Sequence, residues 1–212
     1  MITADGTDIM TLSANVSSDP FCTAMMLPIR LLLSAMAKGY RRRDIGIKTE
    51  YLFSSRADKD SLASSVSSIL GVYRAFIELC VSSDSEVKYS GGEPTVVKCT
   101  AVCKRRRGKK NIPQKFTADG SHLYLLRVSF TQDGLPDFAA LRAACKQIEE
   151  LVRSNKILSA QAVLGDVGET LAAMSSGFCA RNDLTTDEGK LGIILESRDE
   201  LPWEQLGITV RV

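Results

Sequence analysis

The segment from residue 112 to residue 178 constrains the fold most, because strand and helix patterns follow one another there without conflict. Apolar and polar residues alternate over residues 122–130, which predicts a strand because successive strand side chains point to opposite faces. Asp137 is a suitable N-cap for a following helix, whose apolar face would comprise Leu141, Ala144, Ile148 and Leu151. A second strand is predicted over residues 156–164, and the glycine-bearing turn at 165–168 opens another helix through Phe178. This order predicts a βαβα unit.

The first half of the chain repeats the mixture of strands and helices. Alternating or β-branched patterns predict strands at residues 8–15, 45–53 and 95–103. Between the first two strands, residues 21–38 predict a long helix that Pro28 should kink or split.

A second long helix is predicted to begin with Asp60 as its N-cap. Large apolar side chains recur at helical spacing along it, and we expect them to face the core: Leu62, Val66, Ile69, Tyr73, Phe76 and Leu79. The polar residues 81–86 then predict a turn or loop between this helix and the next strand.

These elements predict a mixed α and β protein, α+β or α/β in class, with two lobes. The first lobe, residues 1–103, should combine helices with an antiparallel sheet. The second lobe, residues 112–212, should hold a mixed sheet flanked by helices, with its later strands at 191–196 and 208–212. Residues 104–111 would link the two lobes. Because the chain stops within a predicted strand, we expect it to be a portion of a larger protein.

Composition excludes several classes of function. The 212 residues are 44% apolar, enough for a packed core, and a net charge of +2 gives no general bias toward nucleic acid. With His122 as the only histidine and no C-x-x-C pair, a zinc site or a histidine-based triad is disfavoured. No apolar run reaches the roughly 20 residues of a membrane span. We therefore expect a cytoplasmic protein with buried thiols at Cys22, Cys80, Cys99, Cys103, Cys145 and Cys179.

Four short motifs occur in order in the second half: PQKF at 113–116, GSHLYL at 120–125, GLPDF at 134–138 and ILSA at 157–160. Their order and spacing resemble the second synthetase-like module of the phosphoribosylformylglycinamidine synthase family in its large, fused form. The first half resembles the same module through DPF at 19–21, KGY at 38–40 and EYLF at 50–53. The resemblance extends over residues 8–212.

The resemblance implies a role in de novo purine synthesis. The family converts formylglycinamide ribonucleotide, ATP and glutamine to the amidine, with magnesium and a glutaminase domain whose nucleophilic cysteine has no counterpart in this sequence. The partners it implies are the other synthetase-like module and the glutaminase domain. It assigns no catalytic residue to this segment, so we expect the degenerate structural half of an ATP-dependent amidotransferase or ligase; a purely non-catalytic scaffold is the alternative.

The family holds nucleotide phosphates and magnesium with a glycine-rich loop that carries a lysine, an aspartate and a serine. The corresponding residues here are 81–86, in which Asp84 and Ser85 match while the glycines and the lysine do not. Lysine supplies positive charge and glycine permits close backbone approach to phosphate, so their loss weakens this segment as a nucleotide site. Asp84 and Ser85 therefore remain either nucleotide ligands or parts of a plain polar turn.

A second candidate site is the turn formed by Gly165, Asp166, Val167 and Gly168. At a strand-to-helix junction the free backbone N–H groups can bind an anion such as phosphate. The alternative is that Asp166 simply caps the helix.

The basic run KRRRGKK at 104–110 places six positive side chains in seven residues. Such a run is typical of a solvated linker, and Arg41, Arg42 and Arg43 suggest a similar charged turn. The alternative is a phosphorylated ligand or RNA bound by the run at 104–110, although no aromatic residues interleave it for base stacking.

In the family, the first lobes of two modules join through their strands. Apolar strands at residues 9–14 and 95–102 would then be left with unpaired edges in an isolated module. We therefore expect a homodimer through the first lobe.

Overall fold

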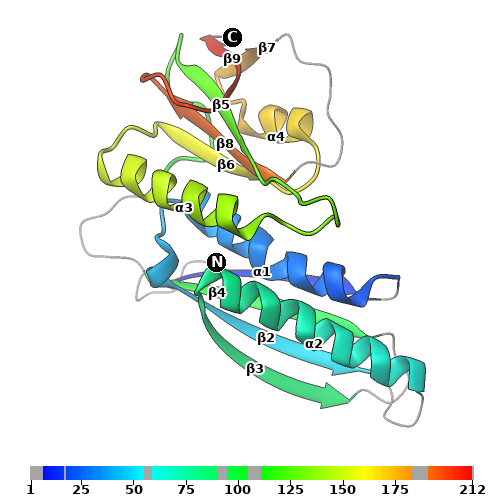
Figure 1. Ribbon diagram of the computed structural model, residues 1–212. Helices are drawn as coiled ribbons and strands as arrows, with labels where there is room; N and C mark the ends of the chain where they lie inside the picture. Colours follow the sequence, from blue (N-terminus) through cyan, green and yellow to red (C-terminus); the bar gives the residue numbers. More distant parts are fainter. Residues whose placement is uncertain are drawn as a thin grey trace. The chain divides into compact units, whose positions relative to one another are not determined.

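A computed structural model describes residues 7–16, 18–54, 59–89, 95–104, 111–182 and 191–211. The chain divides into two compact units, one of residues 1–35 and 41–107, the other of residues 36–40 and 108–212. Each unit has its own β-sheet accompanied by helices (Figure 1). The mixed α and β class predicted from the sequence is confirmed.

The first unit is built on a four-stranded sheet with the order β1-β4-β2-β3. Its strands are β1 (Thr7–Asn15), β2 (Ile45–Phe53), β3 (Ser82–Tyr89) and β4 (Val96–Lys104). β4 pairs antiparallel with β1 and β2, whereas β2 and β3 run parallel because α2 crosses between them. The sheet is therefore mixed rather than antiparallel. Moreover, β4 is a central strand, so residues 95–102 are not the unpaired edge that the sequence suggested.

Helix α1 (Pro20–Ala37) is buried along most of its length and runs as one continuous helix through Pro28. Asp19 accepts a hydrogen bond from the amide of Cys22 at its start. Gly39 ends it with φ of +90°, a backbone conformation that glycine adopts without strain. A short 3-10 helix, η1 (Arg42–Asp44), then leads into β2, and Arg41 bonds Asp44 at 3.0 Å.

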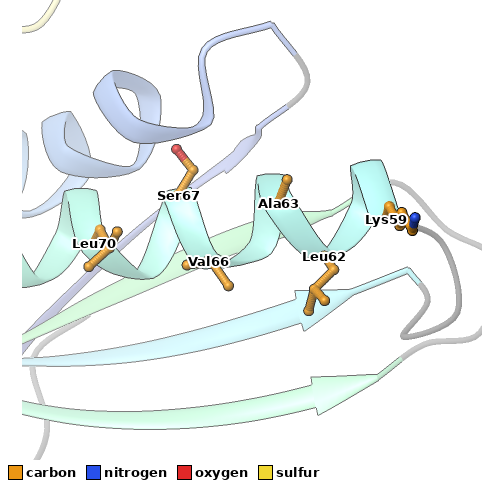
Figure 2. Close-up of a pocket in the computed structure, with 6 residues that line it drawn as sticks. All are labelled: Lys59, Leu62, Ala63, Val66, Ser67 and Leu70. Carbon is orange, nitrogen blue, oxygen red and sulfur yellow. The ribbon is translucent and has the colours of Figure 1, made fainter.

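Helix α2 (Lys59–Leu79) presents a face to the core that matches the predicted one only at Phe76 and Leu79. The buried face carries mainly small residues: Ser65, Ser68, Gly71, Val72, Ala75, Phe76 and Leu79. Leu62, Val66 and Tyr73 are exposed instead, and the first two line a shallow pocket along the helix (Figure 2). The reason is a close approach to α1, because a Cβ added at Gly71 would lie 2.1 Å from the carbonyl oxygen of Phe21. Only small residues fit where the two helices approach at Gly71, so Leu62, Val66 and Tyr73 are on the outer face, while Phe76 and Leu79 are buried nearer the end of the helix.

The open face of the first sheet is charged. Lys98 bonds Glu50 at 2.8 Å across β4 and β2, and Lys48 and Lys88 lie 3.5 and 3.3 Å from Glu86 on β3. The hydrogen bond from Lys98 is the main reason that the pKa of Glu50 is lowered.

The second unit contains a five-stranded sheet with the order β6-β8-β5-β9-β7. Its elements are β5 (His122–Arg127), α3 (Phe138–Arg153), β6 (Ser159–Val163), α4 (Val167–Met174), β7 (Phe178–Asn182), β8 (Gly192–Ser197) and β9 (Glu204–Arg211). Every neighbouring pair is antiparallel, in place of the mixed sheet expected. β5 and β6 still run in the same direction, as a βαβ unit requires, but β8 lies between them.

One face of this second sheet packs against α4. The shared core comprises Phe116, Leu123, Leu125, Val163, Val167, Leu171, Met174, Ile194 and Leu206. The predicted helix after the 165–168 turn is thus confirmed, although it ends at Met174. Phe178 instead begins strand β7, following a turn at Gly177 with φ of +73°.

The expectation that all six thiols are buried needs correction. Cys99, Cys103 and Cys145 are buried, but Cys80 is exposed because it lies just past the end of α2, and Cys22 and Cys179 are partly exposed. By length and composition alone, α1 and α2 pass a test for membrane-spanning helices, but core helices of globular proteins pass the same test, so two such helices are weak evidence for a span. In α1, 61% of the 18-residue apolar window is buried, which is typical of the core helix of a globular protein.

Candidate functional site

The predicted anion-binding turn lies between β6 and α4. Asp166 is the N-cap of α4, and its carboxylate accepts a hydrogen bond of 2.7 Å from the amide of Glu169. Thr170 donates its hydroxyl to the backbone oxygen of Asp166 at 2.8 Å. The capping role considered for Asp166 is therefore present.

This cap limits what else the turn can bind. One first-turn amide is already taken by Asp166, and that carboxylate would repel an incoming phosphate. Gly165 has an ordinary backbone conformation, and nothing lies within 4 Å of a Cβ added there. Neither strain nor a close backbone approach thus requires glycine at this position. Gly168 belongs to the first turn of α4. An anion site at Gly165, Asp166 and Gly168 stays a prediction.

The predicted nucleotide segment is a strand rather than a loop or turn. Asp84 and Ser85 lie within β3, where Asp84 is aligned with Lys48 of β2 and Ser85 with Thr49. Asp84 accepts a hydrogen bond of 2.9 Å from the amide of Ser85. Ser85 bonds the hydroxyl of Tyr51, whose pKa is raised chiefly by burial. The polar sequence gave no strand signal, since β3 is exposed along its whole length and depends on pairing with β2.

The two predicted segments belong to different units, and each is described by itself. Asp84 and Ser85 are part of the first unit, and the turn at 165–168 is part of the second. Of the basic run at 104–110, only Lys104 is described, as the exposed last residue of β4; residues 105–110 lie outside the described part.

A polar cluster that the sequence analysis missed surrounds Glu196 in the second unit. Glu196 is fully buried on β8, and its carboxylate accepts hydrogen bonds of 2.6 Å from the hydroxyls of Ser121 and Ser159. The amides of Thr117 and Ala118 also donate to it, each at 3.0 Å. A charged residue at the end of the apolar run LGIILE was the only signal in the sequence.

Hydrogen bonds join the Glu196 cluster to the rest of the second sheet. Ser121 and Thr209 lie 2.8 Å apart through their hydroxyl oxygens, and both are buried. The cluster therefore fixes the segment before β5 to β6, β8 and β9. Since the carboxylate is fully buried and its acceptor sites are already used by these donors, the cluster is suited to structure rather than to binding a substrate.

Magnesium requires oxygen ligands, typically carboxylates, gathered at one place. Within the described ranges, no three or more His, Cys, Asp or Glu side chains are grouped so that they could hold a metal ion. Asp84 has lysine rather than acidic neighbours across the strand pair. The described residues around Asp84 and Asp166 thus do not fit a magnesium-nucleotide site.

A scan of protein-family models finds no match, and a search of curated protein sequences also finds none. Solved structures do match. PurL of T. maritima complexed with ATP superposes with a TM-score of 0.73 at 14% identity, covering 98% of this chain and 40% of PurL. A hydrogenase maturation protein, HypE, gives 0.69 at 15% identity, covering 97% of this chain and 80% of HypE. Thiamine monophosphate kinase from Aquifex aeolicus gives 0.67 at 9% identity, with coverages of 99% and 85%.

These likenesses define the fold: the chain has the synthetase-like, PurM-like fold that these proteins share. The chain spans about two fifths of the length of the PurL chain in its ATP complex, but more than three quarters of HypE and of the thiamine monophosphate kinase.

Proposed function

We propose that this chain is a non-catalytic synthetase-like domain, the structural half of an ATP-dependent amidotransferase or ligase that forms formylglycinamidine ribonucleotide. One observation carries the proposal. The segment that corresponds to the family's phosphate-holding loop is a regular strand, β3, whose residues are all classed as exposed. A paired strand has its backbone N–H groups directed along the sheet, so it cannot wrap around a phosphate as a glycine-rich loop does.

The composition of β3 supports the same proposal. Neither glycine nor lysine occurs between Ser82 and Glu86, and in this segment the acidic residues are Asp84 and Glu86. Phosphoryl transfer depends on positive charge and on positioned magnesium to stabilise the transition state. The nearby Lys48 and Lys88 lie beside Glu86, so their positive charges are already partly neutralised and attract ATP less strongly.

The purine-synthesis part of the proposal is supported by the sequence motifs that resemble the synthase family, and the likeness to PurL is consistent with it. PurL of T. maritima has been solved in complex with ATP and with AMPPCP. In our proposal ATP and magnesium bind to the other synthetase-like module of the assembled enzyme. That module and a glutaminase domain are the proposed partners, in the cytoplasm.

The experiment is a turnover assay of the purified chain. It would be mixed with formylglycinamide ribonucleotide, ATP, magnesium and ammonia, and ADP would be measured over time. The proposal predicts no release of ADP above the buffer blank. Release of ADP that depends on the ribonucleotide would refute the non-catalytic role, and release that is independent of the ribonucleotide would favour a different ATP-using protein of the same fold.

A further inference from the structure

The hydrogen bonds around the carboxylate of Glu196 all run from uncharged donors to its two oxygens. Oε1 accepts from the hydroxyl of Ser121 at 2.6 Å and from the amide of Ala118 at 3.0 Å. Oε2 accepts from the hydroxyl of Ser159 at 2.6 Å, and from the amide and the hydroxyl of Thr117 at 3.0 and 3.2 Å. We call these five donor groups the oxyanion cradle. Because they are shared between two oxygens, the cradle matches a planar carboxylate.

The described residues place no cation in the oxyanion cradle. Two lysines near it in the sequence have other partners, since Lys115 donates to the carbonyl oxygen of Ala173 and Lys156 bonds Asp199 at 3.0 Å. Hydroxyl and amide dipoles alone must therefore offset the free-energy cost of burying the negative charge. Two of the donors are amides of successive residues, an arrangement that binds anions in other proteins.

The oxyanion cradle is held in shape by contacts that do not involve Glu196. Thr209, fully buried on β9, accepts a hydrogen bond of 2.9 Å from the amide of Ser121 and donates one of 2.7 Å to the carbonyl oxygen of Ala118. Gly120 forms the turn between them with φ of +68°, and its amide bonds the carbonyl oxygen of Thr209 at 2.9 Å. The donors therefore keep their directions independently of the carboxylate.

We propose that the oxyanion cradle is a binding site for a small carboxylate, which this chain occupies with its own Glu196. The site belongs to the second unit, whereas the proposed function rests on β3 of the first. In the wild-type chain the covalent tether keeps the glutamate at a high effective concentration, so a free carboxylate does not displace it. Truncation to alanine vacates the cradle, and the atoms removed, a methylene and a carboxylate group, correspond to those of acetate.

Charge and hydrogen-bonding pattern make the vacant cradle selective. Without Glu196 its buried N–H and O–H groups lose their acceptor, which is unfavourable. Acetate supplies two acceptor oxygens and one negative charge. Acetamide has nearly the same shape, but it carries no charge and sets an NH₂ donor against the donors of the cradle. The site should therefore take a carboxylate and reject the neutral amide.

Thermal unfolding of Glu196→Ala in sodium acetate tests the proposal at neutral pH, with sodium chloride at the same ionic strength as the reference. We expect the Tm to rise by a few degrees as acetate fills the cradle, and acetamide to have no such effect. The wild-type chain and Glu200→Ala, which alters an exposed glutamate, are controls for a general effect of the salt and should respond much less. An equal response of all three proteins, no response of Glu196→Ala, or an equal effect of acetamide would each overturn the proposal.

A double-mutant cycle decides the question if Glu196→Ala does not fold. The paired change of Ser121→Ala and Ser159→Ala should lower the urea midpoint of the wild-type chain, because each hydroxyl bonds a charged oxygen. The same pair should lower the midpoint of Glu196→Gln less, since glutamine has no charge and only one acceptor oxygen. A smaller shift in Glu196→Gln would support the proposal, and equal shifts in the two backgrounds would overturn it.

Discussion

Among single residues, Glu196 has the greatest structural consequence. Its carboxylate satisfies hydroxyl and amide donors from two segments of the second unit while being fully buried. Burying such a carboxylate carries a desolvation cost in free energy, so it occurs only where hydrogen-bond donors surround the group. The residue was missed because hydrophobic patterning identifies apolar cores and gives no information on a buried acid whose partners lie about 40 to 80 positions away in the chain.

The first prediction concerns the change Glu196→Gln. Glutamine has one acceptor oxygen and a donor NH₂ group, so the hydroxyl of Ser121 or Ser159 loses its acceptor. We expect a loss of about 2 to 4 kcal/mol of unfolding free energy, measured by urea denaturation. Glu200→Gln at an exposed position is the control and should change stability by less than about 0.5 kcal/mol. Equal effects of the two changes would show that the Glu196 cluster contributes no more to the unfolding free energy than an exposed glutamate does.

The second prediction concerns the pH dependence of the pair formed by Glu50 and Lys98. Hydrogen bonding to Lys98 lowers the pKa of Glu50 in the folded chain. The stabilisation that ionised Glu50 contributes is therefore complete above the ordinary glutamate pKa of about 4.3. It is lost as the pH falls through the lower pKa of Glu50 in the folded chain. Lys98→Met should reduce the loss of stability between neutral and acidic pH, measured by denaturation at both. An unchanged difference would contradict this assignment.

At the scale of helices and strands, the sequence predicts an element's bounds best where a single residue pattern determines them. The bounds of β2 match the prediction, and α3 begins after Asp137, whose side chain accepts a hydrogen bond of 3.0 Å from Ala140. Prediction from the sequence fails where a tertiary contact determines the conformation or the buried face of an element. β3 has no apolar alternation and is stabilised by pairing with β2, and the buried face of α2 is selected by its close contact with α1.

The third prediction tests this close contact through Gly71→Ala. Alanine would favour an isolated helix by about 1 kcal/mol, but its Cβ would collide with the carbonyl oxygen of Phe21. We therefore expect a net destabilisation of about 2 kcal/mol or more, since backbone atoms must move apart. Gly165→Ala, where the added Cβ meets open space, is the matched control and should be nearly neutral. A stabilising Gly71→Ala would show that α1 and α2 are further apart than described.

For the whole molecule, the sequence predicts the mixed class and the resemblance predicts the synthetase-like fold; both agree with the structure and with its likeness to PurL. The division at residues 107 and 108 lies within the predicted linker, but residues 36–40 join the second unit, where Lys38 accepts a hydrogen bond from Ile112. Neither the directions of the strand pairs nor the exposure of Leu62, Val66 and Tyr73 on α2 could be predicted, because both depend on how elements meet in space.

The central claim is our proposal that this chain does not bind ATP, although PurL, which shares its fold, has been solved in complex with ATP. Calorimetric titration of the chain with ATP in excess magnesium tests this most directly, because it detects binding whether or not any reaction follows. The account predicts no saturable heat up to millimolar ATP, since β3 is a paired strand without glycine and Asp166 caps the first turn of α4. Saturable binding in the micromolar range or tighter would contradict it.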